Sequence, residues 1–70
     1  MKQPIQFYEF DHRYGMHKFI RRMYIFGNVN LSKGDLVVVD GVEYEVVMNK
    51  YEFEDSGEIK QTVYLIKKNK

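Results

Sequence analysis

The stretch VVVDGVEYEV, residues 37–46, predicts a tight β-hairpin. Asp40 and Gly41 suit the two central positions of a type I′ turn, because both positions need positive φ. This turn pairs Val39 with Val42, Val38 with Glu43, Val37 with Tyr44 and Leu36 with Glu45. Side chains alternate between the two faces of a strand. One face is therefore expected to join the core, with Val37, Val39, Val42, Tyr44 and Val46. The other face, with Leu36, Val38, Glu43 and Glu45, is expected to be half covered.

A second reversal is predicted at residues 54–58, which read EDSGE. A three-residue loop over residues 55–57, with Gly57 left-handed, is the simplest connection. This register pairs Phe53 with Ile59, Tyr51 with Gln61, Val47 with Leu65, Glu52 with Lys60 and Glu45 with Lys67. The two pairs of opposite charge support it, at ~0.2–1 kcal/mol each.

The apolar positions change phase between these two turns. They are even-numbered at Val42, Tyr44 and Val46, and odd-numbered at Tyr51 and Phe53. A β-bulge or sharp bend near residues 48–50 explains the change, as the corners of compact sheets require. The alternative is that both faces are simply covered near residues 46–48.

The N-terminal third is less regular. Residues 5–10 alternate like a strand, and residues 11–15 resemble a turn that ends at Gly15. In residues 18–26, the apolar side chains also fit a helical stripe that Gly27 could end. We favour a strand, because β-branched and aromatic residues dominate and no N-cap residue precedes the segment. The helix stays open as the alternative.

Length and composition restrict the class of protein. Seventy residues allow one domain, residues 1–70, in which residues 67–70 are expected to be a frayed tail. There is no alanine, the best helix former, while valine, isoleucine, tyrosine and phenylalanine are abundant. The chain lacks cysteine, an apolar run of the ~20 residues that cross a bilayer, and signal-peptide features. We therefore expect an all-β, cytoplasmic protein.

Residues 23–39, MYIFGNVNLSKGDLVVV, carry a resemblance to a known class of folds. A strand, a short crossing, a Leu-x-x-Gly-Asp turn and a valine-rich strand resemble the opening of many SH3-like small barrels. Short proteins of this kind are common in phages and prophages of Gram-positive bacteria. The resemblance covers roughly residues 19–66. It implies a small barrel of about five strands and a cytoplasmic, non-catalytic accessory protein, and it transfers no functional residues. Residues 1–18 lie outside the pattern, as an aromatic-rich N-terminal extension expected to pack across one end or pair along an edge.

Few side chains are available for catalysis or for metal binding. The two serines, Ser32 and Ser56, both adjoin turn residues, and no glycine-rich phosphate loop is present. Possible metal ligands gather at Glu9, Asp11, His12 and His17, but their spacing matches no zinc pattern. We therefore predict no enzymatic activity, no metal and no cofactor.

Binding is the function that the composition favours most. Aromatic residues are dense between residues 7 and 26, and a small barrel can hardly bury all of them. Tyrosine and arginine are typical anchors of protein interfaces. We expect a protein-interaction module that docks on an unidentified protein or self-associates. Its predicted contact residues are Tyr8, Phe10, Tyr14, Arg21, Arg22 and Tyr24.

Binding of single-stranded nucleic acid is the alternative, because cations and aromatics are mixed between residues 12 and 24. Its predicted contact residues are His12, Arg13, Tyr14, Lys18, Arg21 and Arg22. The net charge is only +1, and seven acids lie between residues 40 and 58. Strand alternation also places Arg21 on the face opposite to Lys18 and Arg22. The basic residues are therefore not expected to form one stripe.

Overall fold

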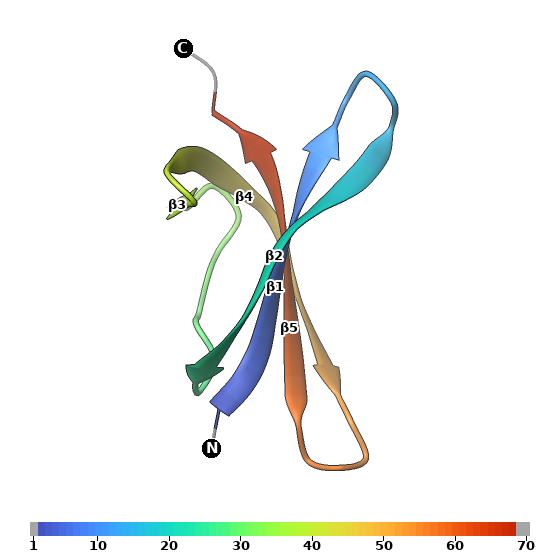
Figure 1. The fold of residues 1–70 in the computed structure, drawn as a ribbon, viewed down its shortest axis with the longest axis vertical. Helices are drawn as coiled ribbons and strands as arrows, with labels where there is room; N and C mark the ends of the chain where they lie inside the picture. The colour runs from blue at the N-terminus through green and yellow to red at the C-terminus, as the bar shows by residue number, and fades with distance from the viewer. Residues whose placement is uncertain (1, 69–70) are drawn as a thin grey trace.

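The computed structural model describes residues 2–68, which form one five-stranded sheet curled into half a barrel (Figure 1). The strands are β1 (Lys2–Asp11), β2 (Met16–Phe26), β3 (Leu36–Val39), β4 (Val42–Phe53) and β5 (Ile59–Lys67). Their order across the sheet is β2-β1-β5-β4-β3. The β1–β5 pair is parallel and the other pairs are antiparallel. The all-β prediction is confirmed. Residues 2–68 contain no helix that is long and apolar enough to cross a membrane.

The hairpin of β3 and β4 has the predicted turn and register. Asp40 and Gly41 have φ values of 52° and 80°, and all four predicted residue pairs are observed. Val39, Tyr44 and Val46 are buried in the core, and the two other residues of that face pack against it. On the opposite face, the side chains of Leu36 and Val38 are exposed, so this face is more open than expected.

The turn between β4 and β5 is also confirmed. Gly57 has a φ of 91°, and Phe53, Glu52 and Tyr51 pair with the three predicted residues of β5. The Lys60 Nζ lies 3.5 Å from a carboxylate oxygen of Glu52.

On the N-terminal side of Met48, the predicted register between β4 and β5 is wrong. Val46 pairs with Leu65 where Val47 was expected, and Glu45 pairs with Ile66 rather than with Lys67. The cause is a bulge between Val46 and Met48, which adds one residue to β4 and shifts every later pair. Glu45 instead forms an ion pair of 3.7 Å with Lys68.

This bulge confirms the predicted phase change, close to its expected place. Because of it, Asn49 and Tyr51 lie on the same side of the sheet as Tyr44 and Val46. Both then reach the segment between β2 and β3. The Asn49 Nδ2 donates to the Leu31 carbonyl at 3.1 Å, and the Tyr51 hydroxyl donates to the Val29 carbonyl at 3.1 Å.

Gln61 completes this attachment from β5. Its side chain is 0% exposed, and its Oε1 accepts a hydrogen bond from the Val29 amide at 3.2 Å. Its Nε2 donates to the Val29 carbonyl at 2.8 Å and to the Asn49 Oδ1 at 2.9 Å. The crossing segment is therefore held by paired polar groups as well as by Leu31, which packs against the core.

The N-terminal residues form part of the main sheet. β1 lies between β2 and β5, and its Ile5 and Phe7 are buried in the core. The N-terminal segment therefore supplies an inner strand, and the prediction that it packs across one end or pairs along an edge is wrong for β1. Residues 18–26 belong to strand β2, so the strand prediction is confirmed and the helix alternative is wrong. Of the predicted frayed tail, Lys67 is the last residue of β5, and residues 69–70 lie outside the described part of the chain.

Candidate binding surfaces

The sheet has a core side, which carries Ile5, Phe7 and Leu65, and an opposite side that we call the outer face. Cross-strand partners point to the same side, so the register assigns each residue to one of them. From β1, β2 and β5, the outer face receives Lys2, Pro4, Gln6, Tyr8, Phe10, His17, Phe19, Arg22, Tyr24, Phe26, Lys60, Thr62, Tyr64 and Ile66. None of these residues is acidic.

Five rings from three adjacent strands form an aromatic cluster on the outer face: Tyr8, Phe10, His17, Phe19 and Tyr64. Tyr8 stacks on Tyr64 with ring centroids 5.7 Å apart and an interplanar angle of 28°, and it meets Phe19 edge-on at 5.6 Å. His17 lies 4.6 Å from Tyr64 and 5.1 Å from Phe10. The parallel pairing of β1 with β5 creates this cluster, because it sets Tyr8 directly beside Tyr64.

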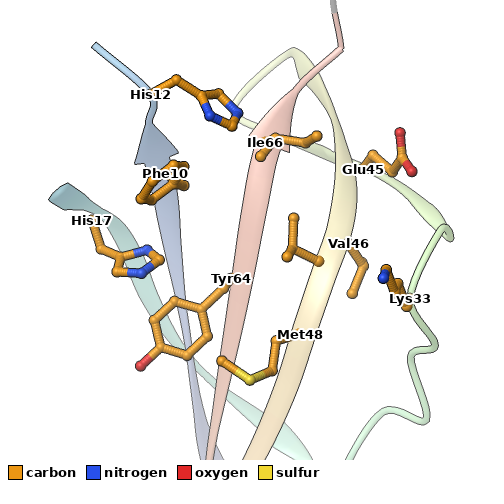
Figure 2. A pocket seen from close by; sticks show the side chains of 10 residues that line it. Phe10, His12, His17, Lys33, Glu45, Val46, Met48, Tyr64 and Ile66 are labelled. Carbon is orange, nitrogen blue, oxygen red and sulfur yellow. The ribbon is translucent and has the colours of Figure 1, made fainter. Parts of the chain in front are cut away.

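A largely apolar groove of about 480 Å³ adjoins the aromatic cluster (Figure 2). Its lining residues are Phe10, His12, His17, Lys33, Glu45, Val46, Val47, Met48, Tyr64 and Ile66. The sequence analysis missed Met48, Tyr64 and Ile66 as candidate site residues. The available signal was the alternation along β5, which places Tyr64 and Ile66 opposite to the buried Val63 and Leu65.

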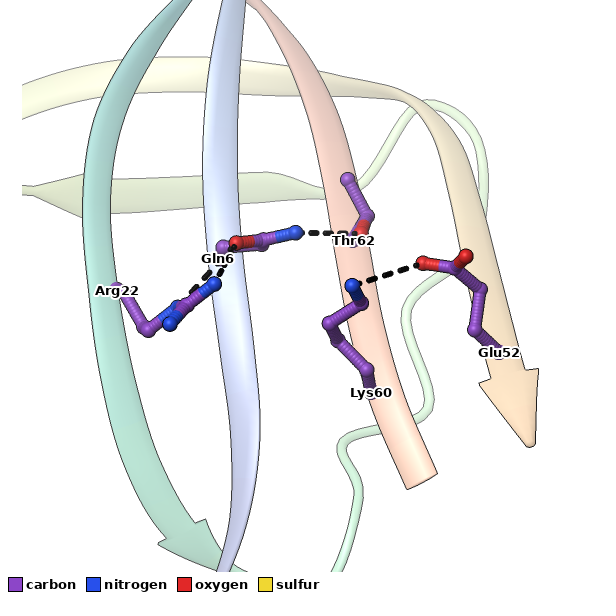
Figure 3. Close-up of polar contacts among 5 residues, drawn as sticks. All are labelled: Gln6, Arg22, Glu52, Lys60 and Thr62. Carbon is purple, nitrogen blue, oxygen red and sulfur yellow. Dashed lines mark hydrogen bonds and ion pairs between the residues drawn. The ribbon is translucent and has the colours of Figure 1, made fainter. Parts of the chain in front are cut away.

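Polar contacts organise the outer face beside the cluster (Figure 3). The Gln6 Nε2 donates to the Thr62 Oγ1 at 3.2 Å, and both residues are buried. The Arg22 Nε and one terminal nitrogen donate to the Gln6 Oε1 at 3.3 and 3.1 Å. These hydrogen bonds fix the Arg22 guanidinium over the neighbouring strand β1. Because Gln6 is neutral, they leave the positive charge of Arg22 in place.

The basic residues predicted for nucleic-acid binding do not lie together. Arg21 is on the core side of the sheet, where it forms an ion pair of 2.8 Å with Asp40. Lys18 pairs with Glu9 on that same side, whereas Arg22 is on the outer face. The expected separation of Arg21 from Arg22 is confirmed, but Lys18 lies with Arg21. The cause is a register irregularity between β1 and β2, which places Ile20 as an extra residue.

The turn between β1 and β2 holds the remaining predicted cation. The Arg13 Nε lies 3.4 Å from the Asp11 Oδ1, and the Arg13 amide donates to the same oxygen at 3.0 Å. Desolvation raises the pKa of Asp11, but the hydrogen bonds and charge of Arg13 outweigh it and lower the pKa below its ordinary value.

Of the residues predicted to contact a protein partner, Tyr8, Phe10, Arg22 and Tyr24 share the outer face. Arg21 lies on the core side, and Tyr14 is 71% exposed in the turn beyond β1. The structure therefore brings four of the six residues onto one side of the sheet.

Strand β2 forms one edge of the sheet. It pairs with β1 along one side, and no strand within residues 2–68 pairs with its other side. Met16, Phe19, Met23, Tyr24 and Phe26 all expose their side chains, and Phe26 is 78% exposed. An edge of this length presents both open backbone groups and apolar surface.

The four possible metal ligands of the sequence analysis are also divided. Glu9 and Asp11 lie on the core side of β1, while His12 and His17 line the groove on the outer face. Within the described residues, no three histidine or carboxylate side chains are placed to hold a metal ion.

Comparison of the chain with protein-family models, curated proteins and solved structures finds no match.

Proposed function

We propose that the protein is a non-enzymatic protein-interaction module that docks on its partner through strand β2. The observation that carries this proposal is the unpaired edge of β2, whose apolar side chains are exposed on both faces. An extended segment could add to this edge through backbone hydrogen bonds while its side chains meet those of β2. A domain of this size also buries little surface alone, so that docking would add to its stability.

The charge of β2 favours an acidic partner over a second copy of the chain. β2 contains Lys18, Arg21 and Arg22 but no acidic residue. In a symmetric antiparallel pair of β2 strands, the register of fullest overlap sets Arg21 opposite its own copy. The two neighbouring symmetric registers set Arg22 against itself or against Lys18. Like charges directly opposite each other are destabilising, so we assign the edge to an extended acidic segment of another protein.

We further propose that the module is an SH3-like barrel and a cytoplasmic accessory protein of a phage or mobile element. The support is the resemblance over residues 23–39, together with a curled sheet of five strands. The aromatic-rich N-terminal segment then serves this barrel as strand β1 and the start of its docking edge.

Titration of the ¹⁵N-labelled protein with two synthetic peptides tests the docking edge. One peptide alternates valine with glutamate, and the matched control alternates valine with lysine. The valine–glutamate peptide should shift the amide signals of β2, whereas the valine–lysine peptide should not. Equal effects of both peptides, or shifts centred on β3, would contradict the proposal.

A charge reversal of the edge provides the second test. Replacing Lys18 and Arg22 with glutamate should exchange the two peptide preferences, while the same change at Lys67 and Lys68, on β5 and beyond it, should not. Light scattering should find the free protein monomeric. A dimer whose interface is β2 would replace the acidic partner with a second copy and overturn the heterotypic assignment.

A further inference from the structure

We infer that the outer face binds single-stranded nucleic acid, with bases stacked on the aromatic cluster and one base in the adjoining groove. This site lies on the face of the sheet and does not rest on the docking proposed for the β2 edge. It also differs from the basic set predicted from sequence, because its central residues are Tyr64, Tyr8 and His17.

The aromatic cluster offers faces on which bases can stack. Its rings come from β2, β1 and β5, so they form a row across adjacent strands rather than one isolated ring. Phe19, at the end of the row, is 52% exposed. Stacking on aromatic side chains tolerates any base, because every base has a π face.

The groove supplies a place for one base beside this row. Its volume of about 480 Å³ falls in the range of small-molecule sites. Tyr64 and His17 form one wall, and Met48 and Ile66 bring apolar side chains from β4 and β5 (Figure 2). A base suits these walls because its flat π faces can pack against aromatic and apolar side chains.

The charges around the site select an anionic ligand. The outer-face residues of β1, β2 and β5 include no carboxylate, and Arg22 is held across them by Gln6. The Lys50 Nζ lies over the Tyr64 ring, 5.7 Å from its centroid, and Lys33 lines the groove. Two carboxylates lie beside the site on β4: Glu52, which pairs with Lys60, and Glu45, which lines the groove and lies 3.7 Å from Lys68. Each of them has a lysine as its ion-pair partner.

These charges favour nucleic acid over a protein ligand on this face. Charged residues are depleted from the cores of protein interfaces, yet Lys50 lies directly over a central ring of the cluster. Nucleic acid uses both features, because phosphates contact the cations while bases stack on the rings.

Fluorescence anisotropy with a labelled single-stranded DNA of mixed sequence and about twelve nucleotides, within the ~4–16 that one small barrel covers, tests the site. With three cations, Arg22, Lys33 and Lys50, on phosphates, the logarithm of the binding constant should fall with the logarithm of salt concentration with a slope of about −2. Lys50→Gln should reduce the slope by about 0.7. Lys18→Gln, with the same charge change on the core side, should leave it unaltered.

Variants of Tyr64 test stacking. Tyr64→Leu should weaken binding about tenfold, within the ~5- to 150-fold expected for loss of one stacked base, while Tyr64→Phe should preserve it. The matched control is Phe53→Leu, an aromatic residue 79% exposed at the far end of β4. Circular dichroism checks that each variant is folded.

Three outcomes would overturn the inference: no binding at low salt, equal loss in Tyr64→Phe and Tyr64→Leu, or equal slopes in Lys50→Gln and Lys18→Gln. Poly-glutamate that binds equally tightly, and is weakened equally by Tyr64→Leu, would assign the face to acidic protein instead; poly-glutamate binding that Tyr64→Leu leaves unchanged belongs to the β2 edge. The valine–glutamate peptide titration at β2 should not respond to Tyr64→Leu, so failure of one proposal is distinguishable from failure of the other.

Discussion

Replacement of Gln61 with leucine should weaken the attachment of the crossing segment, residues 27–35, to the sheet. The Gln61 side chain is fully buried and makes three hydrogen bonds, two to the backbone of Val29 and one to Asn49. Leucine has a similar size but can make none of them. The Val29 carbonyl keeps the Tyr51 hydroxyl as a donor, whereas the Val29 amide loses the acceptor that Gln61 provides.

The expected loss follows from these contacts. Three hydrogen bonds at about 1 kcal/mol each give about 3 kcal/mol, with a range of roughly 2–4 kcal/mol once the unpaired Val29 amide and the added apolar burial are included. At ~0.05–0.15 kcal/mol per residue, a domain of this length has a total stability of roughly 3.5–10 kcal/mol. The substitution should therefore remove between about a fifth and all of the free energy of unfolding.

Urea unfolding followed by circular dichroism measures this loss. Gln3→Leu is the matched control, because the Gln3 side chain accepts one hydrogen bond, from the Ile59 amide at 2.8 Å. That control should cost about 1 kcal/mol. Hydrogen exchange of the Val29 amide should accelerate in Gln61→Leu more than in Gln3→Leu. The reasoning fails if the two variants lose equal stability, or if exchange at Val29 is unchanged.

Three further predictions concern the turn and the core. Gly41→Ala should lower the free energy of unfolding in urea by about 1–2 kcal/mol, because the φ of 80° is unfavourable for alanine. No atom lies within 4 Å of the added Cβ, so backbone strain is the only cost. An unchanged urea midpoint would contradict this. Burial, and then the charges of Glu9 and Asp40, raise the pKa of Tyr44 above 10.0. The stability that this raised pKa contributes is fully present below pH 10 and is lost as pH rises through the folded-state pKa of Tyr44. Tyr44→Phe should therefore make the free energy of unfolding fall less steeply above pH 10. Leu65→Ala should cost about 2–5 kcal/mol in thermal unfolding, since Leu65 is 0% exposed against Val46; a loss below 1 kcal/mol would show that the site collapses around the cavity.

The features predicted correctly from sequence are those that depend on neighbouring residues. The Asp40-Gly41 turn sets its own backbone angles, and the alternation around it selects the buried face. Local residue preferences also predicted the left-handed conformation of Gly57 and the strand at β2. The change of phase in the apolar positions after Val46 predicted a bulge. It could not place that bulge to the residue, so the pairs of Val47 and Glu45 were wrong.

The candidate site depended on pairing between distant segments. The sequence predicted Tyr8 and Phe10, but not Tyr64, as candidate binding residues, because β1 and β5 are separated by most of the chain. Their parallel pairing sets Tyr8 beside Tyr64. Neither the sequence of β1 nor that of β5 indicates this pairing, because the parallel neighbour of a strand is selected by burial over the whole sheet.

Gln61 illustrates the same limit within the core. Gln61 stands between a lysine and a threonine in the last strand of the chain, and nothing in these neighbours predicts that its side chain is completely buried. It is buried because the crossing segment passes over it with an amide and a carbonyl that need partners. The sequence by itself determined the turns, the strands and the face that each hairpin buries, because φ preferences and side-chain alternation act within a few residues. Only the tertiary structure decided which strands are neighbours, and hence which rings and charges share the outer face, because that choice depends on burial summed over the whole chain.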